Sequence, residues 1–266
     1  MTLFRVGQEH ISAHALPILV QGVGSPLVVI PGLDGGFGMP TGLSRLISEL
    51  EIVGLSSAAR VWRIGRHPGL RIGTSISELA DAYATLIRAT FTGPVDVVGV
   101  STGGSIALQL AADHPELVRR LVMVSSAHRL GDHGRETQRA VADLLARGHA
   151  RRASALLLSN AAVTAPARVI LAMIGWLASG LVVGRHSEDL RILLDAEDTF
   201  DVTDRLPSMR TPTMIVAGSH DRFYSRALYE EFAHSLPDAS LRLRRSGHLT
   251  MHGDRRLARA VLAFFR

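Results

Sequence analysis

The sequence predicts an α/β protein built on a mostly parallel sheet, and three observations lead to this fold class. Short apolar runs typical of buried strands recur along the chain, most clearly at 95–100. They alternate with stretches whose apolar residues have helical spacing, which indicates βαβ units. The chain of 266 residues is 47% hydrophobic, enough for the substantial core of one large domain or two small ones.

The expected elements follow in order along the chain. Two apolar runs, 14–22 and 25–32, are separated by a glycine-rich turn and predict a hairpin or two neighbouring strands. A strand at 59–65 precedes a helix at 75–91, whose cap is Ser75 or Ser77. The remaining elements are a strand at 95–100, a helix at 103–113, strands at 119–127 and 211–218, a helix at 224–235, a strand at 240–245 and a helix at 254–265.

Residues 130–205 interrupt this alternation. They show helical patterns rich in Ala, Leu and Arg without a clear strand, and they are too many for a simple connection. We therefore expect an inserted helical cap. The domain organisation is a core domain whose first part is 1–129, a cap insertion at 130–205, and a second part of the core at 206–266.

The composition excludes several kinds of chemistry. The chain has no cysteine, which rules out disulfides, thiolate metal sites and a cysteine nucleophile. It has no lysine either, which rules out Schiff-base chemistry and the lysine-dependent phosphate loop. The net charge is +5, but the arginines are spread along the chain among acidic residues, so no nucleic-acid partner is expected. The sequence leaves the oligomeric state open.

Targeting and membrane signals are weak. Residues 1–16 carry charged and histidine side chains where a secretory signal has an apolar stretch, so we expect a cytoplasmic protein. Residues 169–183 have no charge, but they are fewer than the roughly 18–20 that span a bilayer. We expect a buried helix here, or one that lines an apolar pocket, and no stable membrane insertion. Membrane contact is the alternative.

The strongest motif is Gly99-Val100-Ser101-Thr102-Gly103, which fits the G-x-S-x-G nucleophile elbow between a strand and a helix. In such a turn the serine has a strained backbone, and the positions two residues away need glycine because strand and helix approach closely. The motif predicts Ser101 as the nucleophile.

A base and an acid follow in the order that this kind of site requires, Ser, then Asp or Glu, then His. Asp221 comes after the strand at 211–218, at the sheet edge where ligands gather in open α/β sheets. Its alternative role is a helix cap. His248 follows the last strand and is the predicted base, while His252 allows the alternative of a metal half-site.

The glycine-rich loop at 31–38 predicts an oxyanion hole. Its donors would be the backbone N–H groups of Leu33 and of Thr102, the residue after the nucleophile. A dinucleotide-binding turn is the competing interpretation, which Thr41 in the third glycine position and Pro40 disfavour. Asp34, next to Leu33 in this loop, is interpreted as a turn residue before Gly35.

With "PGLDGG", "GVSTGG", "AGSHDRF" and "SGH" in this order, the chain resembles the α/β-hydrolase fold superfamily from about residue 10 to the C-terminus, in its capped, esterase-like serine-hydrolase branch. The resemblance implies an eight-stranded sheet with a helical cap after the sixth strand. Many members have His-Gly where this chain has Pro31-Gly32, so a histidine that braces the oxyanion loop is missing. Dehalogenases and epoxide hydrolases of this fold use an aspartate nucleophile instead.

The expected activity is hydrolysis of a small, partly apolar carboxylic ester through an acyl-enzyme on Ser101, His248 and Asp221, with a small-molecule substrate and no metal or cofactor. A carbon–carbon bond hydrolase of β-diketone type and a cofactor-free peroxidase are alternatives on the same residues. A ligand-binding module with slow or no turnover is a third possibility, which the intact Ser-Asp-His order disfavours.

Substrate choice should belong to the cap. Met173, Trp176 and Leu177 are the predicted substrate-pocket residues. A cluster of arginines could recognise a carboxylate, although a solvated helix face is the simpler interpretation; its members are Arg147, Arg151 and Arg152.

Overall fold

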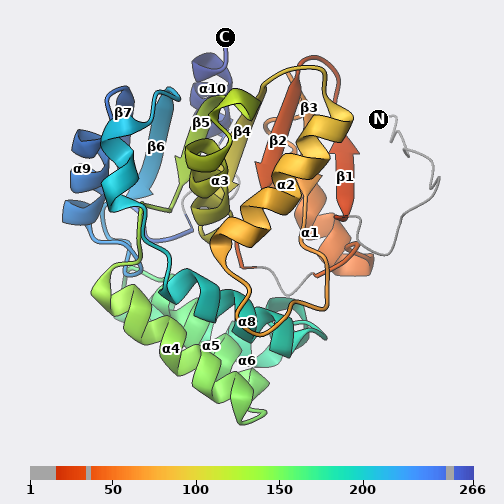
Figure 1. The fold of residues 1–266 in the computed structure, drawn as a ribbon. Coiled ribbons are helices and arrows are strands. Elements are labelled where there is room, and N and C mark those ends of the chain that lie inside the picture. The colour runs from red at the N-terminus through yellow and green to blue at the C-terminus, as the bar shows by residue number, and fades with distance from the viewer. Residues whose placement is uncertain (1–15, 34–36, 250–254) are drawn as a thin grey trace.

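A twisted sheet of seven strands forms the centre of the protein (Figure 1). The computed structural model describes residues 16–33, 37–249 and 255–266. The strands are β1 (Ile18–Gln21), β2 (Pro26–Ile30), β3 (Arg60–Ile64), β4 (Val95–Val100), β5 (Val118–Val124), β6 (Thr213–Gly218) and β7 (Ala239–Arg244). Their order in the sheet is β1-β3-β2-β4-β5-β6-β7. Only β1 runs antiparallel to its neighbour, and the other pairs are parallel, as the sequence predicts.

Two expectations about the sheet need correction. The first two strands do not pair with each other, because β3 lies between them and hydrogen-bonds to both. The chain reaches β3 through helix α1 (Gly42–Ile52), which the sequence analysis missed. This helix lacks the usual apolar inner stripe: Ser48 and Ile52 are buried, whereas Leu43 and Leu50 are exposed. The described residues hold seven strands rather than eight, and residues 1–15 lie outside them.

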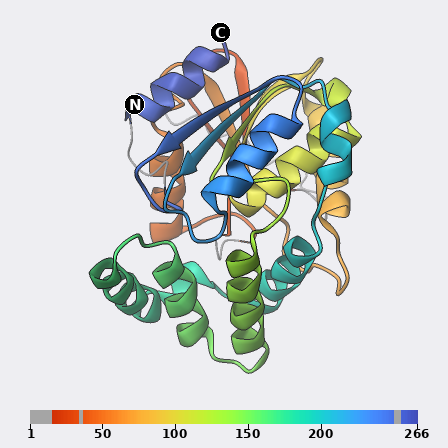
Figure 2. The ribbon, with the colours of Figure 1, turned by 90° about the vertical axis from the view of Figure 1, so that its left-hand side faces the viewer.

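Helices cover both faces of the sheet (Figures 1 and 2). α2 (Ile76–Thr90), α3 (Thr102–Asp113) and α9 (Arg226–Ser235) pack on one face, and α1 and α10 (Arg255–Phe264) pack on the other. The central strands are buried on both sides, so successive residues serve different cores: Val97 faces the first and Val98 the second. Ser75 caps α2 in a reciprocal capping box with Glu78, which confirms one of the two predicted caps.

The chain between β5 and β6 forms a helical layer at the carboxyl edge of the parallel strands (Figure 1). Its helices are α4 (Asp132–Ala146), α5 (Ala150–Asn160), α6 (Ala165–Leu177), α7 (Ser179–Val182) and α8 (Ser187–Asp198), and a 3₁₀ turn at Thr203–Ser208 leads back to the sheet. The insertion follows the fifth described strand.

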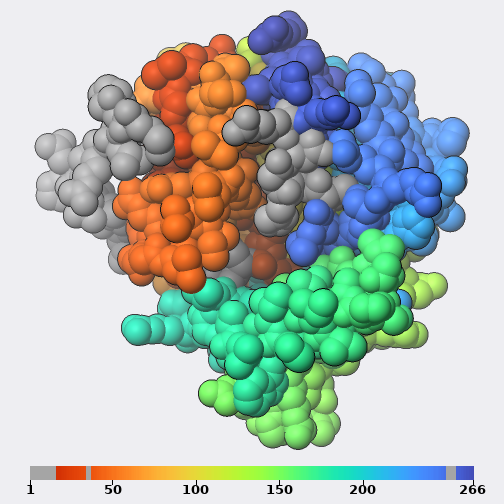
Figure 3. Space-filling model, turned by 180° about the vertical axis from the view of Figure 1, so that it is seen from behind, coloured from red at the N-terminus to blue at the C-terminus, as the bar shows by residue number. Residues whose placement is uncertain are grey.

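Helix α6 differs from the expected buried helix. Gly175 is its one buried residue, whereas Val169 and Leu177 are 63% and 76% exposed. A Cβ at Gly175 would lie 2.4 Å from the carbonyl oxygen of Ser154, so α6 contacts α5 through a glycine and turns its large side chains outward. Figure 3 shows the outer side of this layer below α1. No helix among the described residues has the length and hydropathy of a membrane-spanning segment.

The turn from β4 into α3 is the tightest feature of the core. Ser101 has φ 50° and ψ −125°, outside the helical and extended regions. A Cβ at Gly103 would lie 2.2 Å from the carbonyl oxygen of Ile30, and one at Gly99 would lie 2.6 Å from the Cα of Gly104. The structure therefore confirms that close packing of strand and helix excludes side chains at these two positions.

This packing predicts that Gly103→Ala destabilises the protein by about 1–3 kcal/mol, since the added methyl group meets rigid backbone on β2. Gly93→Ala is the matched control, because a Cβ there has no atom within 4 Å. Urea unfolding followed by circular dichroism measures both free energies. Equal stabilities for the two variants would contradict the proposed crowding.

Candidate active site

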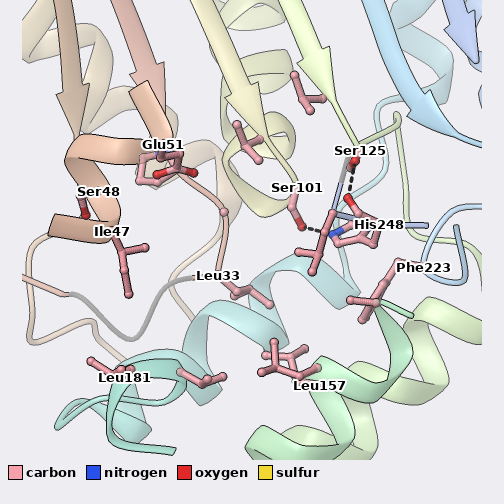
Figure 4. A pocket seen from close by; sticks show the side chains of 18 of the residues that line it. Leu33, Ile47, Ser48, Glu51, Ser101, Ser125, Leu157, Leu181, Phe223 and His248 are labelled. Carbon is pink, nitrogen blue, oxygen red and sulfur yellow. Dashed lines mark hydrogen bonds between the residues drawn. The ribbon is translucent and has the colours of Figure 1, made fainter. Parts of the chain in front are cut away.

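Ser101, His248 and Asp221 form one hydrogen-bonded chain at the carboxyl edge of the sheet. Figure 4 shows its Ser101–His248 part. The Ser101 hydroxyl donates to Nε2 of His248 over 2.9 Å, and Nδ1 of His248 donates to Oδ2 of Asp221 over 2.8 Å. The proton positions follow from this network, because only one ring nitrogen of a neutral histidine can donate. Ser101 follows β4, Asp221 follows β6 and His248 follows β7, so three separate strands supply the chain.

The Asp221 carboxylate is buried and its oxygens are well provided with donors. Oδ1 accepts from the backbone N–H of Phe223 over 2.8 Å and from that of Tyr224 over 3.3 Å. Oδ2 accepts from the Tyr229 hydroxyl over 2.9 Å in addition to His248. These bonds fix the carboxylate and hold the imidazole in the tautomer whose Nε2 faces Ser101. Asp221 is not the cap of α9, since Ser225 accepts from the N–H of Leu228.

The environment of His248 favours the imidazolium ion. Burial alone lowers its pKa, but the charge of Asp221, the hydrogen bond to Asp221 and the charge of Glu197 together raise the pKa above 6.5. Phe223 and Tyr224 flank the ring at centroid distances of 4.6 and 6.0 Å. The Ser125 hydroxyl donates to the backbone carbonyl of His248 over 2.7 Å, which ties this loop to the end of β5.

Glu197, on α8, is a fully buried carboxylate behind these residues. Its oxygens accept four hydrogen bonds, from Thr102 Oγ1 at 2.6 Å, Ser105 Oγ at 2.9 Å, Gln138 Nε2 at 2.9 Å and the Tyr224 hydroxyl at 3.2 Å. All four donors are uncharged. The insertion thus places a buried negative charge against the first turn of α3, next to Ser101.

The start of the glycine-rich loop, at Pro31–Leu33, passes close to Ser101. A Cβ at Gly32 would lie 3.2 Å from Cβ of Ser101, and Leu33 lines the cavity beside it. Thr102 is the first residue of α3, where backbone N–H groups have no partner within the helix. Gly32, which precedes Leu33, and Thr102, which follows Ser101, therefore both lie beside Ser101.

Arg66, which follows β3, binds the backbone at the start of this loop. Its side chain is 1% exposed, and its guanidinium donates to the carbonyl oxygens of Pro31, over 2.7 Å, and Gly32. The guanidinium also lies over the ring of Phe37, with its central carbon 5.7 Å from the ring centroid. A planar cation that bridges two successive carbonyls restrains the peptide that precedes the Leu33 N–H.

A cavity of about 310 Å³ opens beside Ser101 and His248 (Figure 4). Its apolar wall comes mainly from the insertion, and its polar side from α1 and β3. The apolar lining includes Leu157, Leu158, Ala161, Leu181, Val182 and Phe223, and the polar lining includes Ser44, Ser48, Glu51 and Arg63. This volume suits a small molecule with one apolar and one polar part.

The predicted pocket residues lie elsewhere. Met173, Trp176 and Leu177 do not line the cavity, and they are 57%, 45% and 76% exposed. Helix α6 packs on α5 through Gly175, so its large side chains point away from the cavity. Residues of α5 and α7 form the apolar wall instead. The arginines of the predicted carboxylate patch, Arg147, Arg151 and Arg152, are likewise exposed and lie outside the cavity lining. Asp34 and His252 fall outside the described residues.

Sequence reasoning missed Arg66, Glu197 and Ser125. The position of Arg66 could have been predicted, because it follows β3 and therefore lies at the same sheet edge as Ser101. Ser125 follows β5 and has φ 50°, but no glycine pattern marks its strain. Glu197 has no local signal, since an isolated glutamate in a helix is usually solvated. No group of three or more metal-binding side chains gathers within the described ranges.

The sequence and the fold are similar to those of known proteins. A family profile described as alpha/beta hydrolase family matches residues 27–260. Among curated proteins, the chain is 28% identical over 238 residues to a putative carbamate hydrolase RutD of Azorhizobium caulinodans, a match that covers 84% of this chain and 83% of the relative.

Solved structures share the fold. A putative non-heme bromoperoxidase, BpoC, of Mycobacterium tuberculosis is similar with a TM-score of 0.77 and 23% identity, covering 97% of this chain and 98% of that one. The enol-lactonase of Burkholderia xenovorans is similar with a TM-score of 0.75 and 20% identity, covering 94% and 96%. With a family profile spanning most of the chain and the sheet arranged as described, the protein is an enzyme that belongs to the alpha/beta hydrolase family.

Proposed function

We propose that the protein is a serine hydrolase that cleaves a small, partly apolar carboxylic ester with Ser101, His248 and Asp221 as its catalytic triad. The observation that carries the proposal is the continuous hydrogen-bonded chain from the Ser101 hydroxyl through both nitrogens of His248 to Asp221. A serine hydroxyl becomes a useful nucleophile only when a neighbouring base accepts its proton, and this geometry provides that base.

In the proposed mechanism, Ser101 Oγ attacks the ester carbonyl carbon while its proton moves to Nε2 of His248. The tetrahedral intermediate collapses when the bond to the leaving alcohol breaks and His248 returns the proton to the alcohol oxygen. Water, deprotonated by His248, then attacks the acyl carbon; the bond to Ser101 Oγ breaks, His248 returns the proton to Oγ, and the acid leaves. Asp221 and Glu197 stabilise the transient imidazolium, because both raise the pKa of His248.

The negative charge of the intermediate forms on the carbonyl oxygen, and the backbone N–H groups of Leu33 and Thr102 are its proposed donors. Arg66 holds the first donor by anchoring the carbonyls of Pro31 and Gly32, and Glu197 holds the second by anchoring the Thr102 side chain. Both supports are buried, so the donors are in position before the charge develops.

The cavity supports a substrate with a short apolar part against the leucines of the insertion and a polar part toward Ser48, Glu51 and Arg63. Lactones and carbamates present the same kind of carbonyl to Ser101. The names of an enol-lactonase and a carbamate hydrolase among the similar proteins make both groups worth including in a substrate panel.

A fluorophosphonate probe tests the nucleophile directly. We expect a single adduct by intact-mass analysis of the wild type, none with Ser101→Ala, and labelling slowed by at least about 10³-fold with His248→Ala, because the hydroxyl then lacks its base. Ser105→Ala is the control, since that serine donates to Glu197 and not to His248. Labelling of folded Ser101→Ala at the wild-type rate would refute the assignment of the nucleophile.

The raised pKa of His248 predicts the pH dependence. The base works only when neutral, so kcat/KM on a small ester should fall as the pH drops through a midpoint above 6.5. Glu197→Gln removes one of the charges that raise this pKa, and the midpoint should move to lower pH. Asp195→Asn on the same helix is the control, because Asp195 is exposed and paired with Arg191. An unshifted midpoint in folded Glu197→Gln would show that Glu197 does not act on His248.

Arg66→Lys tests the support of the oxyanion loop. Lysine keeps the charge but cannot bridge two carbonyls as a planar guanidinium does, so we expect kcat to fall about 10- to 100-fold with KM nearly unchanged. Arg60→Lys is the control, since Arg60 lies exposed over Trp62. Wild-type kcat in folded Arg66→Lys, verified by circular dichroism, would exclude this role.

A further inference from the structure

The outer face of α6 is an unusual surface for a helix of this layer. Six large apolar side chains on it are between 45% and 76% exposed, and we call them the α6 face: Val169, Ile170, Met173, Ile174, Trp176 and Leu177. Contiguous exposed apolar side chains mark a surface that meets a partner or a lipid phase. The packing explains their exposure, because α6 approaches α5 through Gly175 and has no apolar side chain buried beneath it.

The charged residues of the segment that carries this face are all basic. Between Asp143 and Glu188 the sequence holds five arginines and no acidic residue. Arg147 is neutralised by Asp143, but Arg151 and Arg152 are exposed on α5. The Arg151 guanidinium lies over the Trp176 ring, with its central carbon 4.7 Å from the ring centroid, so a cation lies directly at the edge of the apolar surface.

Helix α7, which contacts α6, brings an exposed apolar side chain to the cavity. Leu181 of α7 and Ile47 of α1 both line the cavity and are themselves 39% and 46% exposed. Helix α1, on the other side of the cavity mouth, carries further exposed leucines. Its two acidic residues are each neutralised by an arginine, Glu49 by Arg45 and Glu51 by Arg63. Figure 3 shows α1 and the insertion together on this side of the molecule.

We propose that the α6 face, with Arg151 and Arg152 at its edge, binds the surface of an anionic lipid membrane and holds the cavity mouth against it. An apolar helix too short to span a bilayer can lie in the interface, with its side chains at the boundary between headgroups and acyl chains. Guanidinium groups at its margin reach the phosphates, and an indole next to them suits the interfacial layer.

Charge complementarity favours this occupant over a second copy of the chain. A symmetric dimer through the α6 face would bring the arginines of α5 against their own equivalents, with no acidic residue in the segment to pair with them. An anionic lipid surface supplies the opposite charge and accepts the apolar side chains at the same time.

Vesicle binding provides the test, and the Ser101→Ala protein is used so that the result is independent of catalysis. The chain has two tryptophans, so Trp62→Phe leaves Trp176 as the sole source of tryptophan fluorescence. With vesicles of equimolar phosphatidylglycerol and phosphatidylcholine at low salt, we expect a blue shift of Trp176 emission and flotation of the protein with the lipid. Pure phosphatidylcholine should bind at least about tenfold more weakly, since the arginines contribute only with anionic headgroups.

Two sets of variants separate the contributions. Met173→Glu with Leu177→Glu should reduce flotation at least about tenfold, and so should Arg151→Gln with Arg152→Gln. Val23→Glu is the matched control, because Val23 is 73% exposed on the turn between β1 and β2, away from the insertion. None of these residues lines the cavity, so when the same substitutions are made in the protein with Ser101 intact, turnover of a soluble ester should stay at the wild-type rate in all three.

Several results would overturn the proposal. These are no binding to anionic vesicles at low salt, equal binding to neutral and anionic vesicles, or unchanged binding in the α6 variants. Sedimentation velocity without lipid gives a further one: a stable dimer that Met173→Glu with Leu177→Glu dissociates would assign the α6 face to a second copy of the chain.

Discussion

The backbone of Ser101 is the constraint on which the rest of the site depends. Its φ of 50° turns the chain sharply from β4 into α3 and leaves the hydroxyl at the carboxyl edge of the sheet. The turn is possible only because Gly99 and Gly103 allow β4, α3 and β2 to approach within distances that a Cβ would not permit. Strain of this kind persists because the surrounding core holds it, and β4 is buried almost throughout.

Two buried charges lie on either side of this turn, and each matches a charge that the proposed reaction creates. Arg66 is bound to the loop where an oxyanion would form, and Glu197 lies on the side of His248, where an imidazolium would form. Burying an ion is unfavourable unless hydrogen bonds satisfy it, and both side chains have several partners. The positive charge of Arg66 on one side of Ser101 and the negative charge of Glu197 on the other are therefore in place before any substrate binds.

The sequence was sufficient to predict those features whose local pattern is compatible with one structure only. The alternation of strands and helices predicted the parallel sheet, and the glycines around Ser101 predicted its turn. Asp221 and His248 could be proposed because each follows a strand that ends at the same edge. Features that depend on packing between distant elements could not be read in the same way. The apolar pattern of α6 looks buried, and only its contact with α5 through Gly175 shows which side faces out.

Glu197 limits how freely the insertion can be exchanged between proteins of this fold. Its four donors come from the core helix α3, the inserted helix α4 and the loop before α9, so one carboxylate joins segments that are far apart in the sequence. Exchanging the insertion for one without an acid at this position would remove this acceptor and leave the Thr102, Ser105 and Tyr224 hydroxyls without it. A chimera that keeps the core therefore has to import a buried acid at this position of its insertion.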